Sequence, residues 1–283
     1  MTRRSLLFTP GDREAMLRKA PTTGADIIAF DLEDAVAPAD KDDARQTVAD
    51  VLTDPSFDPD CEVFVRTNPL PEGRTDLAVV LDDSEAVLDG LIVPKASSAA
   101  SVTELADAAA EHGRELPVLA LVESAAGVLA APEIAAATPT DGLLFGAEDL
   151  AADLGATRTS GGTEVLYARE RVVAAARAAG VDAIDTLYTA IDDEDGLRED
   201  AAFARQLGYD GKMAIHPAQV DPIHDAMTPD AEQIEWARRV LDARPASNTV
   251  VYEVDGEMID APLIRQAERI LSRVPDDESD TGQ

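Results

Sequence analysis

Short apolar runs recur along the chain, and most are followed by a longer segment whose apolar residues are spaced as on one face of a helix. The runs are rich in Val, Ile, Leu and Phe, which favour strands. We expect eight strands, at residues 5–8, 26–30, 62–65, 90–93, 118–122, 142–145, 182–184 and 212–215. A short buried strand alternating with a helix is typical of repeated βα units.

Amphipathic segments between these runs, many of them rich in alanine, are expected to be helices that cover a parallel sheet. They span residues 13–20, 41–52, 101–111, 125–136, 163–179 and 196–207. Eight alternations without a break in composition favour a closed TIM-type (β/α)8 barrel over an open doubly wound sheet. The first turn, Thr9-Pro10-Gly11-Asp12, also lacks the GxGxxG pattern of dinucleotide-binding sheets.

Three regions are predicted from this pattern. Residues 1–225 are expected to form the barrel, and residues 226–273 a C-terminal extension that acts as a lid, packed on the barrel or on a neighbouring subunit. Within the extension we expect helices at residues 231–241 and 262–271, and a hairpin or strand at residues 249–254. Residues 274–283 are polar and acidic, as in a frayed tail.

Charge is the strongest feature of the composition, with 56 acidic against 24 basic residues and a net charge of −32. A nucleic acid partner is not expected for such a chain. Molar salt shortens the Debye length to about 3 Å and screens the self-repulsion, so the composition indicates a salt-loving cytoplasm. The sequence has neither a membrane-length apolar run nor a secretory signal, and its single cysteine, Cys61, can form no disulfide within the chain.

Polar side chains follow most of the predicted strands, where the reacting groups of TIM barrels lie. Glu123 follows the fifth strand and Asp149 closely follows the sixth. Two hard carboxylates on adjacent strand ends suit Mg²⁺, which keeps several waters for a substrate to displace. The alternative is that both are solvated loop acids. Only three histidines occur in the chain, so a zinc site is not expected.

Arg66 ends the third strand, where its guanidinium could hold a substrate carboxylate or a developing enolate through two parallel hydrogen bonds. The alternative is a salt bridge to Glu33 or Asp34, and the two interpretations are compatible because such an acid would orient the arginine. Asp31 is also interpreted as an orienting group. Glycine permits close approach, so the N–H groups of Gly146 and Ala147 could contact a substrate carboxylate.

Together these residues resemble the HpcH/HpaI aldolase and citrate lyase β-subunit (CitE-like) family. The resemblance extends from Arg4 to about Leu271. It is carried by the stretches RSLLFTPGDREAMLRKA, ADIIAFDLEDAVAPADK, VRTN, LIVPKA, LALVESAAGV, LLFGAEDLAADLGA, GYDGKMAIHPAQV and GEMIDAPLIRQAERIL.

The resemblance implies a homotrimeric or homohexameric TIM-barrel enzyme with Mg²⁺ on Glu123 and Asp149. An arginine matching Arg66 would hold the substrate. We also expect Glu123, Gly146 and Ala147 to contact the substrate. In several members an aspartate of the C-terminal segment is offered to the neighbouring subunit's active site, and Asp260 matches that residue. Asp260 is therefore expected to move a proton in the reaction.

Three activities remain open on these grounds. The first is Mg²⁺-dependent carbon–carbon cleavage of a small hydroxyacyl-CoA of the malyl-, citramalyl- or citryl-CoA type, which releases acetyl-CoA and an oxo acid. The second is hydrolysis of malyl-CoA to malate and CoA, and the third is a CoA-independent aldolase acting on 2-oxo acids. A catalytically silent subunit of a larger lyase complex is a further alternative.

Overall fold

The computed structural model describes residues 2–83, 85–244 and 251–274. The chain divides into two compact units, one formed by residues 3–225 and the other beginning at Ala226. The candidate chemistry at the strand ends belongs to the first unit, and Asp260 belongs to the second. Among the described residues, no helix is both long enough and apolar enough to cross a lipid bilayer.

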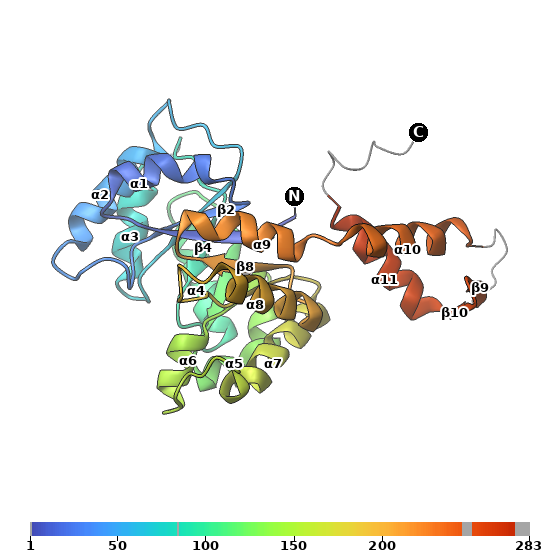
Figure 1. Ribbon diagram of the computed structural model, residues 1–283. Helices are drawn as coiled ribbons and strands as arrows, with labels where there is room; N and C mark the ends of the chain where they lie inside the picture. Colours follow the sequence, from blue (N-terminus) through green and yellow to red (C-terminus); the bar gives the residue numbers. More distant parts are fainter. Residues whose placement is uncertain (1, 84, 245–250, 275–283) are drawn as a thin grey trace. The chain divides into compact units, whose positions relative to one another are not determined.

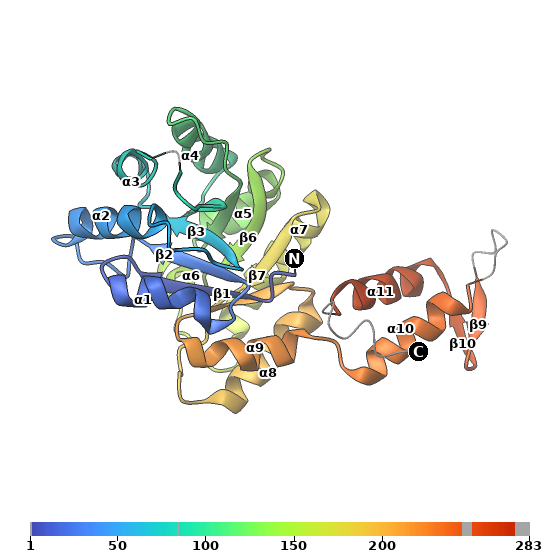
Figure 2. The same cartoon turned by 90° about the horizontal axis from the view of Figure 1, so that it is seen from above.

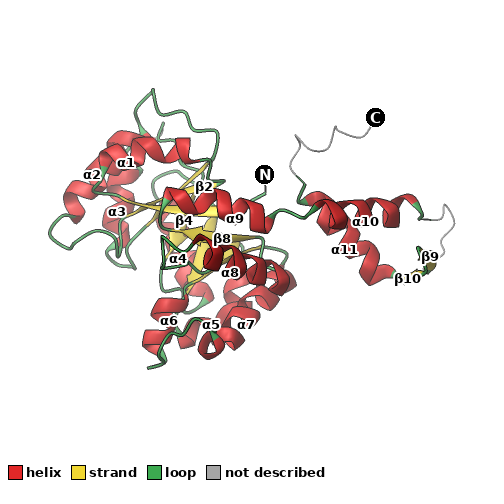
Figure 3. Ribbon diagram, in the orientation of Figure 1, coloured by secondary structure: helices red, strands yellow, loops and turns green. Residues whose placement is uncertain are grey.

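The first unit is a closed barrel of eight parallel strands in sequential order, which confirms the predicted TIM-type (β/α)8 fold. The strands occupy the centre of the unit, as Figure 3 shows in yellow. They are β1 (Ser5–Pro10), β2 (Ile27–Asp31), β3 (Glu62–Arg66), β4 (Gly90–Val93), β5 (Val118–Val122), β6 (Thr140–Phe145), β7 (Asp182–Asp185) and β8 (Gly211–Ala214).

Helices surround the barrel on its outer side (Figures 1 and 2). They are α1 (Glu14–Lys19), α2 (Lys41–Leu52), α3 (Gly73–Val80), α4 (Ala99–Ala110), α5 (Ala125–Ala135), α6 (Ala147–Asp153), α7 (Thr163–Ala179), α8 (Glu194–Leu207) and α9 (Val220–Met227), with 3₁₀ turns η1 (Ala20–Thr23) and η2 (Pro217–Gln219). The sequence pattern did not predict α3, α6 and α9, which are seven or eight residues long.

The barrel interior is a packed apolar core and not a channel. Each strand contributes inward-pointing side chains that are at most 2% exposed, and they are Leu6, Ile27, Ala29, Phe64, Ile92, Leu119, Leu121, Leu144, Ile184 and Met213. Phe64 requires a glycine on the next strand, since a Cβ at Gly90 would lie 2.2 Å from the Phe64 ring. Burial on both faces explains why these strands read as continuous apolar runs.

An ion-pair cluster joins the strands at the N-terminal end of the barrel. Arg3, just before β1, donates to Glu62 at 2.6 Å, to Asp141 at 2.5 Å and to Asp182 at 3.1 Å. These three acids belong to β3, β6 and β7. Polar residues here stabilise the barrel, whereas in TIM barrels the reacting groups lie at the opposite, C-terminal end.

The second unit contains α10 (Ala231–Asp242), β9 (Tyr252–Val254), β10 (Glu257–Ile259) and α11 (Ala261–Ser272). The two helices pack side by side over a small core of their own (Figure 2), made of Ala237, Val240, Val254, Ile259, Ile264 and Ala267. The strands form an antiparallel pair. Residues 249 and 250 of the predicted hairpin, and residues 275–283 of the predicted tail, lie outside the described part of the chain.

Candidate active site at the C-terminal mouth of the barrel

Several of the predicted site residues line one cavity at the C-terminal ends of the strands. The cavity has a volume of about 140 Å³. Its walls include Phe8 of β1, Asp31 of β2, Arg66 of β3, Glu123 after β5, and Gly146, Ala147 and Asp149 at the start of α6. The parallel strands bring these positions together because their carboxyl ends all meet at one mouth of the barrel.

Glu123 is a buried acid whose side chain is almost fully enclosed, at 3% exposed. Its Oε1 accepts a hydrogen bond of 2.8 Å from the backbone N–H of Lys95. Burial raises the pKa of Glu123 to about 8, with further raising from the negative charges of Asp149 and Glu33, against the opposing effects of the Lys95 N–H and Arg66. Such a carboxylate favours a cation that can compensate its buried charge.

Gly146 makes the position of Glu123 possible. A Cβ at residue 146 would lie 2.7 Å from the Cβ of Glu123 and 2.8 Å from its Oε2, so no other residue fits without moving the acid. The N–H of Gly146 donates to Val122 O at 3.0 Å and the N–H of Ala147 donates to Thr186 Oγ1 at 3.1 Å. Both amides are therefore engaged within the chain, which differs from their expected use as donors to a substrate carboxylate.

Asp149 lies in the first turn of α6 and is exposed to the cavity mouth, not on the strand end itself. No hydrogen bond or ion pair to its carboxylate is found in the described residues. Within that same part of the chain, no three His, Cys, Asp or Glu side chains gather in a metal-binding cluster. A cation here would therefore rest on two carboxylates and take its other ligands from water and substrate, as Mg²⁺ commonly does.

Arg66 makes its two parallel hydrogen bonds with Asp31 and is thereby oriented within the cavity. Its Nε donates to Asp31 Oδ1 at 2.7 Å and its Nη2 to Asp31 Oδ2 at 2.5 Å. Its Nη1 lies 3.3 Å from Glu33 Oε2, and the guanidinium carbon lies 4.7 Å from the centroid of the Phe8 ring. These contacts leave guanidinium hydrogens that no hydrogen bond uses, because arginine has five.

Lys95 connects the acids of the second and fifth strands, and sequence reasoning assigned it no role. Its backbone is left-handed, with φ of 51°, which aims the N–H at Glu123. Its ammonium contacts Glu33 and lies 3.6 Å from Asp34. The expected salt bridge from Arg66 therefore goes to Glu33, whereas Asp34 pairs with Lys95. A lysine two residues after a predicted strand was the available signal for this role.

The loop after β2 is fixed by a second lysine. The ammonium of Lys41 donates to Leu32 O at 2.9 Å, to Glu33 O at 3.0 Å and to Asn68 Oδ1 at 2.5 Å. All three of its hydrogens thus have acceptors. The backbone that carries Asp31 and Glu33 is held before any substrate binds, which favours a preorganised site.

Asp260 lies in the second compact unit, where it is the N-cap of α11. Its side chain accepts a hydrogen bond of 3.4 Å from the N–H of Leu263. This contact gives the residue a structural function in its own unit. Its expected part in proton transfer stays a prediction.

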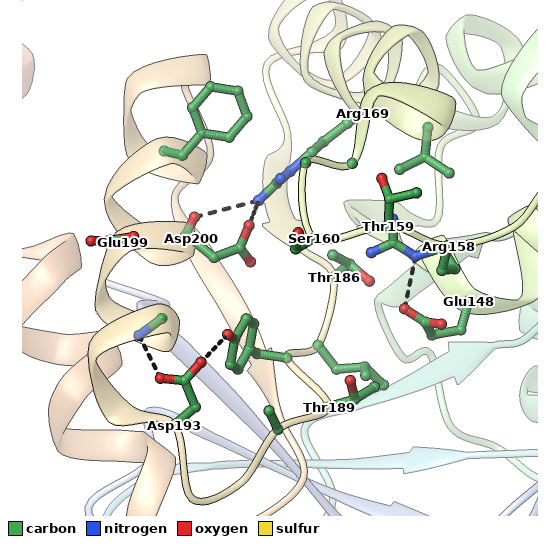
Figure 4. A pocket seen from close by; sticks show the side chains of 18 residues that line it. Glu148, Arg158, Thr159, Ser160, Arg169, Thr186, Thr189, Asp193, Glu199 and Asp200 are labelled. Atoms are coloured by element: carbon green, nitrogen blue, oxygen red, sulfur yellow. Dashed lines mark hydrogen bonds and ion pairs between the residues drawn. The ribbon is translucent and has the colours of Figure 1, made fainter.

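A second, larger groove of about 670 Å³ borders the same mouth (Figure 4). Both cavities are lined by Glu148, Thr186 and Leu187. The arginines of the groove are paired with acids: Arg158 Nε lies 2.9 Å from Glu148, and Arg169 Nη2 lies 3.0 Å from Asp200. Figure 4 shows Arg158 and Glu148 together on one side of the groove and Arg169 with Asp200 on the other.

A closed parallel barrel with buried acids and an arginine at its C-terminal mouth defines a TIM-barrel protein with a candidate cation-dependent site. The model of the HpcH/HpaI aldolase/citrate lyase family matches residues 4–217. The chain belongs to this family, as its sequence predicted.

Relatives of known name cover nearly the whole chain. A citrate lyase subunit beta-like protein of Deinococcus radiodurans is 40% identical over 95% of this chain and 96% of its own length. The mitochondrial citramalyl-CoA lyase of Mus musculus is 33% identical over 95% of this chain and 85% of its own. CitE from Mycobacterium tuberculosis, solved in complex with magnesium, acetoacetate and coenzyme A, is 36% identical with a TM-score of 0.81 and covers 96% of this chain and 98% of its own.

These relatives agree with the expected class, a lyase of the citrate lyase β-subunit type, and with the expected Mg²⁺ cofactor. None of them identifies the roles of individual residues in this chain. The metal ligands, the substrate contacts and the proton-transferring aspartate therefore stay predictions.

Proposed function

We propose that the protein is a Mg²⁺-dependent lyase that cleaves a small hydroxyacyl-CoA thioester into acetyl-CoA and an oxo acid. The observation that carries the proposal is the buried Glu123, whose pKa is raised to about 8 beside Asp149 in one cavity. Two hard oxygen donors of this kind fit Mg²⁺. The relatives named for citrate lyase and citramalyl-CoA lyase supply the reaction class.

Glu123 and Asp149 would hold the metal ion. When bound, Mg²⁺ supplies Lewis acidity toward the carboxylate and the hydroxyl or oxo oxygen of the acid half. Lys95 fixes one oxygen of Glu123 through its N–H, and Gly146 leaves space beside the other. The chain thus positions the ligand before binding, so little reorganisation is needed.

Arg66 would stabilise the negative charge that develops on the thioester. Cleavage breaks the bond between the hydroxyl-bearing carbon and the methylene next to the thioester. The hydroxyl loses its proton to solvent and becomes the oxo group, the electron pair of the broken bond passes to the thioester as an enolate, and protonation of the enolate carbon gives acetyl-CoA. Arg66 keeps its charge because hydrogen bonds and ion pairs with Asp31 and Glu33 raise its pKa despite burial. A fixed, partly buried cation is worth more to a developing anion than one in water.

We also propose Asp260 as the group that transfers a proton to or from the reacting carbon, on the strength of its match to the family aspartate. Asp260→Asn tests this cleanly, since asparagine is also a good N-cap and preserves the start of α11. The rate should fall by about 100-fold or more with an unchanged melting temperature. Asp260→Ala, which also removes the cap, should lose both rate and stability. Full activity in the asparagine variant would limit Asp260 to its structural function.

A product assay tests the activity as a whole. The protein is incubated with Mg²⁺ and, separately, with malyl-CoA, citramalyl-CoA and citryl-CoA, and the products are identified by mass spectrometry. Acetyl-CoA together with glyoxylate, pyruvate or oxaloacetate supports the lyase and identifies the substrate. Free CoA with the intact hydroxy acid would indicate the thioesterase, and turnover of free hydroxy-oxo acids alone would indicate the aldolase. Turnover that persists in EDTA would contradict the proposed dependence on Mg²⁺.

We further propose that the protein assembles as a homotrimer or homohexamer and works in a salt-rich cytoplasm. The assembly is supported by the family resemblance, and the salt-rich setting by the net charge of −32. Light scattering coupled to size-exclusion chromatography at molar salt measures the assembly. A monomer under those conditions would contradict it.

A further inference from the structure

The first turn of α6, which carries Asp149, has no side-chain cap of its own. Its N-cap residue is Gly146, which makes no side-chain hydrogen bond. A serine, threonine or aspartate would normally stand at such a position and accept a bond from one of the first N–H groups. None of these fits here, because a Cβ at Gly146 would collide with Glu123. Residue 146 can therefore leave space for Glu123 or carry a side chain that caps α6, but it cannot do both.

Thr186 supplies the missing acceptor from a different strand. It directly follows β7, is 3% exposed, and its Oγ1 accepts the N–H of Ala147, the first residue of α6, at 3.1 Å. The two residues are 39 positions apart in the sequence. Thr186 lines both cavities, and Figure 4 places it in the middle of the larger groove. Thr186 therefore links the end of β7 to α6, the helix that carries the proposed metal ligand Asp149.

A buried ionic network fixes the backbone of Thr186. Lys212 of β8 is fully buried, and its ammonium donates to Thr186 O at 2.7 Å, to Asp185 Oδ2 at 2.8 Å and to Asp200 Oδ2 at 2.5 Å. Asp185 in turn receives two hydrogen bonds from Arg169, at 2.8 and 2.6 Å. Every hydrogen of the ammonium has an acceptor, so the backbone at residue 186 is tightly fixed.

We propose that Thr186 is a positioning residue that fixes the start of α6, and through it the distance of Asp149 from Glu123. The inference rests on the proposed Mg²⁺ ligands. Asp149 lies two residues after Ala147, within the same turn, so a shift of the helix start moves its carboxylate. Substitution of a residue that contacts a metal ligand but not the metal itself typically lowers metal affinity by about 10-fold to 100-fold.

The test compares a substitution that removes the hydroxyl of residue 186 with one that keeps it. Thr186→Val keeps the shape and removes the acceptor, whereas Thr186→Ser keeps the acceptor. Mg²⁺ binding is measured by isothermal titration calorimetry, with Mn²⁺ and electron paramagnetic resonance as a second probe. We expect the valine variant to bind Mg²⁺ about tenfold more weakly and the serine variant to recover affinity to within about threefold of the unsubstituted protein. Thr186→Ala replaces the valine variant should that one fail to fold.

Thr140→Val is the matched control. Thr140 is also a buried threonine at a barrel strand, and its hydroxyl donates to Ile134 O at 2.7 Å, but it lies at the start of β6, at the other end of the barrel. It should lower the melting temperature and leave Mg²⁺ affinity unchanged. Unchanged Mg²⁺ affinity in Thr186→Val, or an equal loss in Thr140→Val, overturns the inference alone. Absence of Mg²⁺ binding in the unsubstituted protein overturns the proposed metal site as well.

Discussion

The raised pKa of Glu123 predicts that protons and Mg²⁺ compete for one carboxylate. Metal binds the ionised form, so binding below the pKa must release a proton. With a pKa of about 8, the ionised fraction of Glu123 is about 1% at pH 6 and about one half at pH 8. The association constant for Mg²⁺ should therefore rise about 50-fold between these two pH values.

Calorimetry at constant molar salt measures both parts of this prediction. Titrations in two buffers of different ionisation enthalpy should show nearly one proton released per Mg²⁺ near pH 6.5 and almost none above pH 9. Glu123→Gln should weaken binding and abolish its pH dependence. Asp182→Asn, which alters an acid at the opposite end of the barrel, should preserve both. A flat profile in the unsubstituted protein, or one that survives Glu123→Gln, would refute the reasoning.

The raised pKa of Glu123 also makes the stability of the folded chain depend on pH. Because the folded pKa of Glu123 lies above its ordinary value of 4.5, the folded metal-free chain binds this proton more tightly than the unfolded chain does. The stability that Glu123 contributes is complete below about pH 4.5 and is lost as the pH rises through about 8. Added Mg²⁺ should therefore raise the melting temperature more at pH 8.5 than at pH 6, and a reversed order would contradict the shift.

Two further predictions concern the site and the surface. Gly146→Ala should reduce Mg²⁺ affinity at least about tenfold, because its Cβ would displace Glu123, whereas Gly161→Ala in the open groove should not; equal affinities measured by calorimetry would contradict the close contact. Lowering salt below about 0.5 M should lower the melting temperature, since the net charge of −32 is then less screened; a constant melting temperature across a salt series would contradict the salt-loving interpretation.

The barrel could be predicted from sequence because its signal is local. Strands buried on both faces read as apolar runs, and the predicted bounds of 90–93 and 118–122 coincide with β4 and β5. The short α6 has two acids in its first turn and too few apolar residues to show a period, so Asp149 was expected on a strand end. Periodicity reveals a helix only when several turns repeat it.

Pairings within the site were harder to predict because they join distant residues. The sequence indicated an acid for Arg66, but the choice of Asp31, 35 positions away, depends on the register of β2 against β3. The use of Gly146 as space for Glu123 likewise depends on β5 lying beside β6. Lys95 and Thr186 acquire their functions only from such cross-strand contacts.

The scarcity of lysine determines how this protein can be handled. The chain has four lysines, and three of them make the internal contacts described for Lys41, Lys95 and Lys212. Lys19 at the end of α1 is exposed and makes no such contact. Amine-reactive dyes should therefore attach most readily at Lys19 and more slowly at Lys95, whose side chain is 47% exposed but whose ammonium pairs with Glu33, while exhaustive reductive methylation would remove ammonium hydrogens that these contacts use.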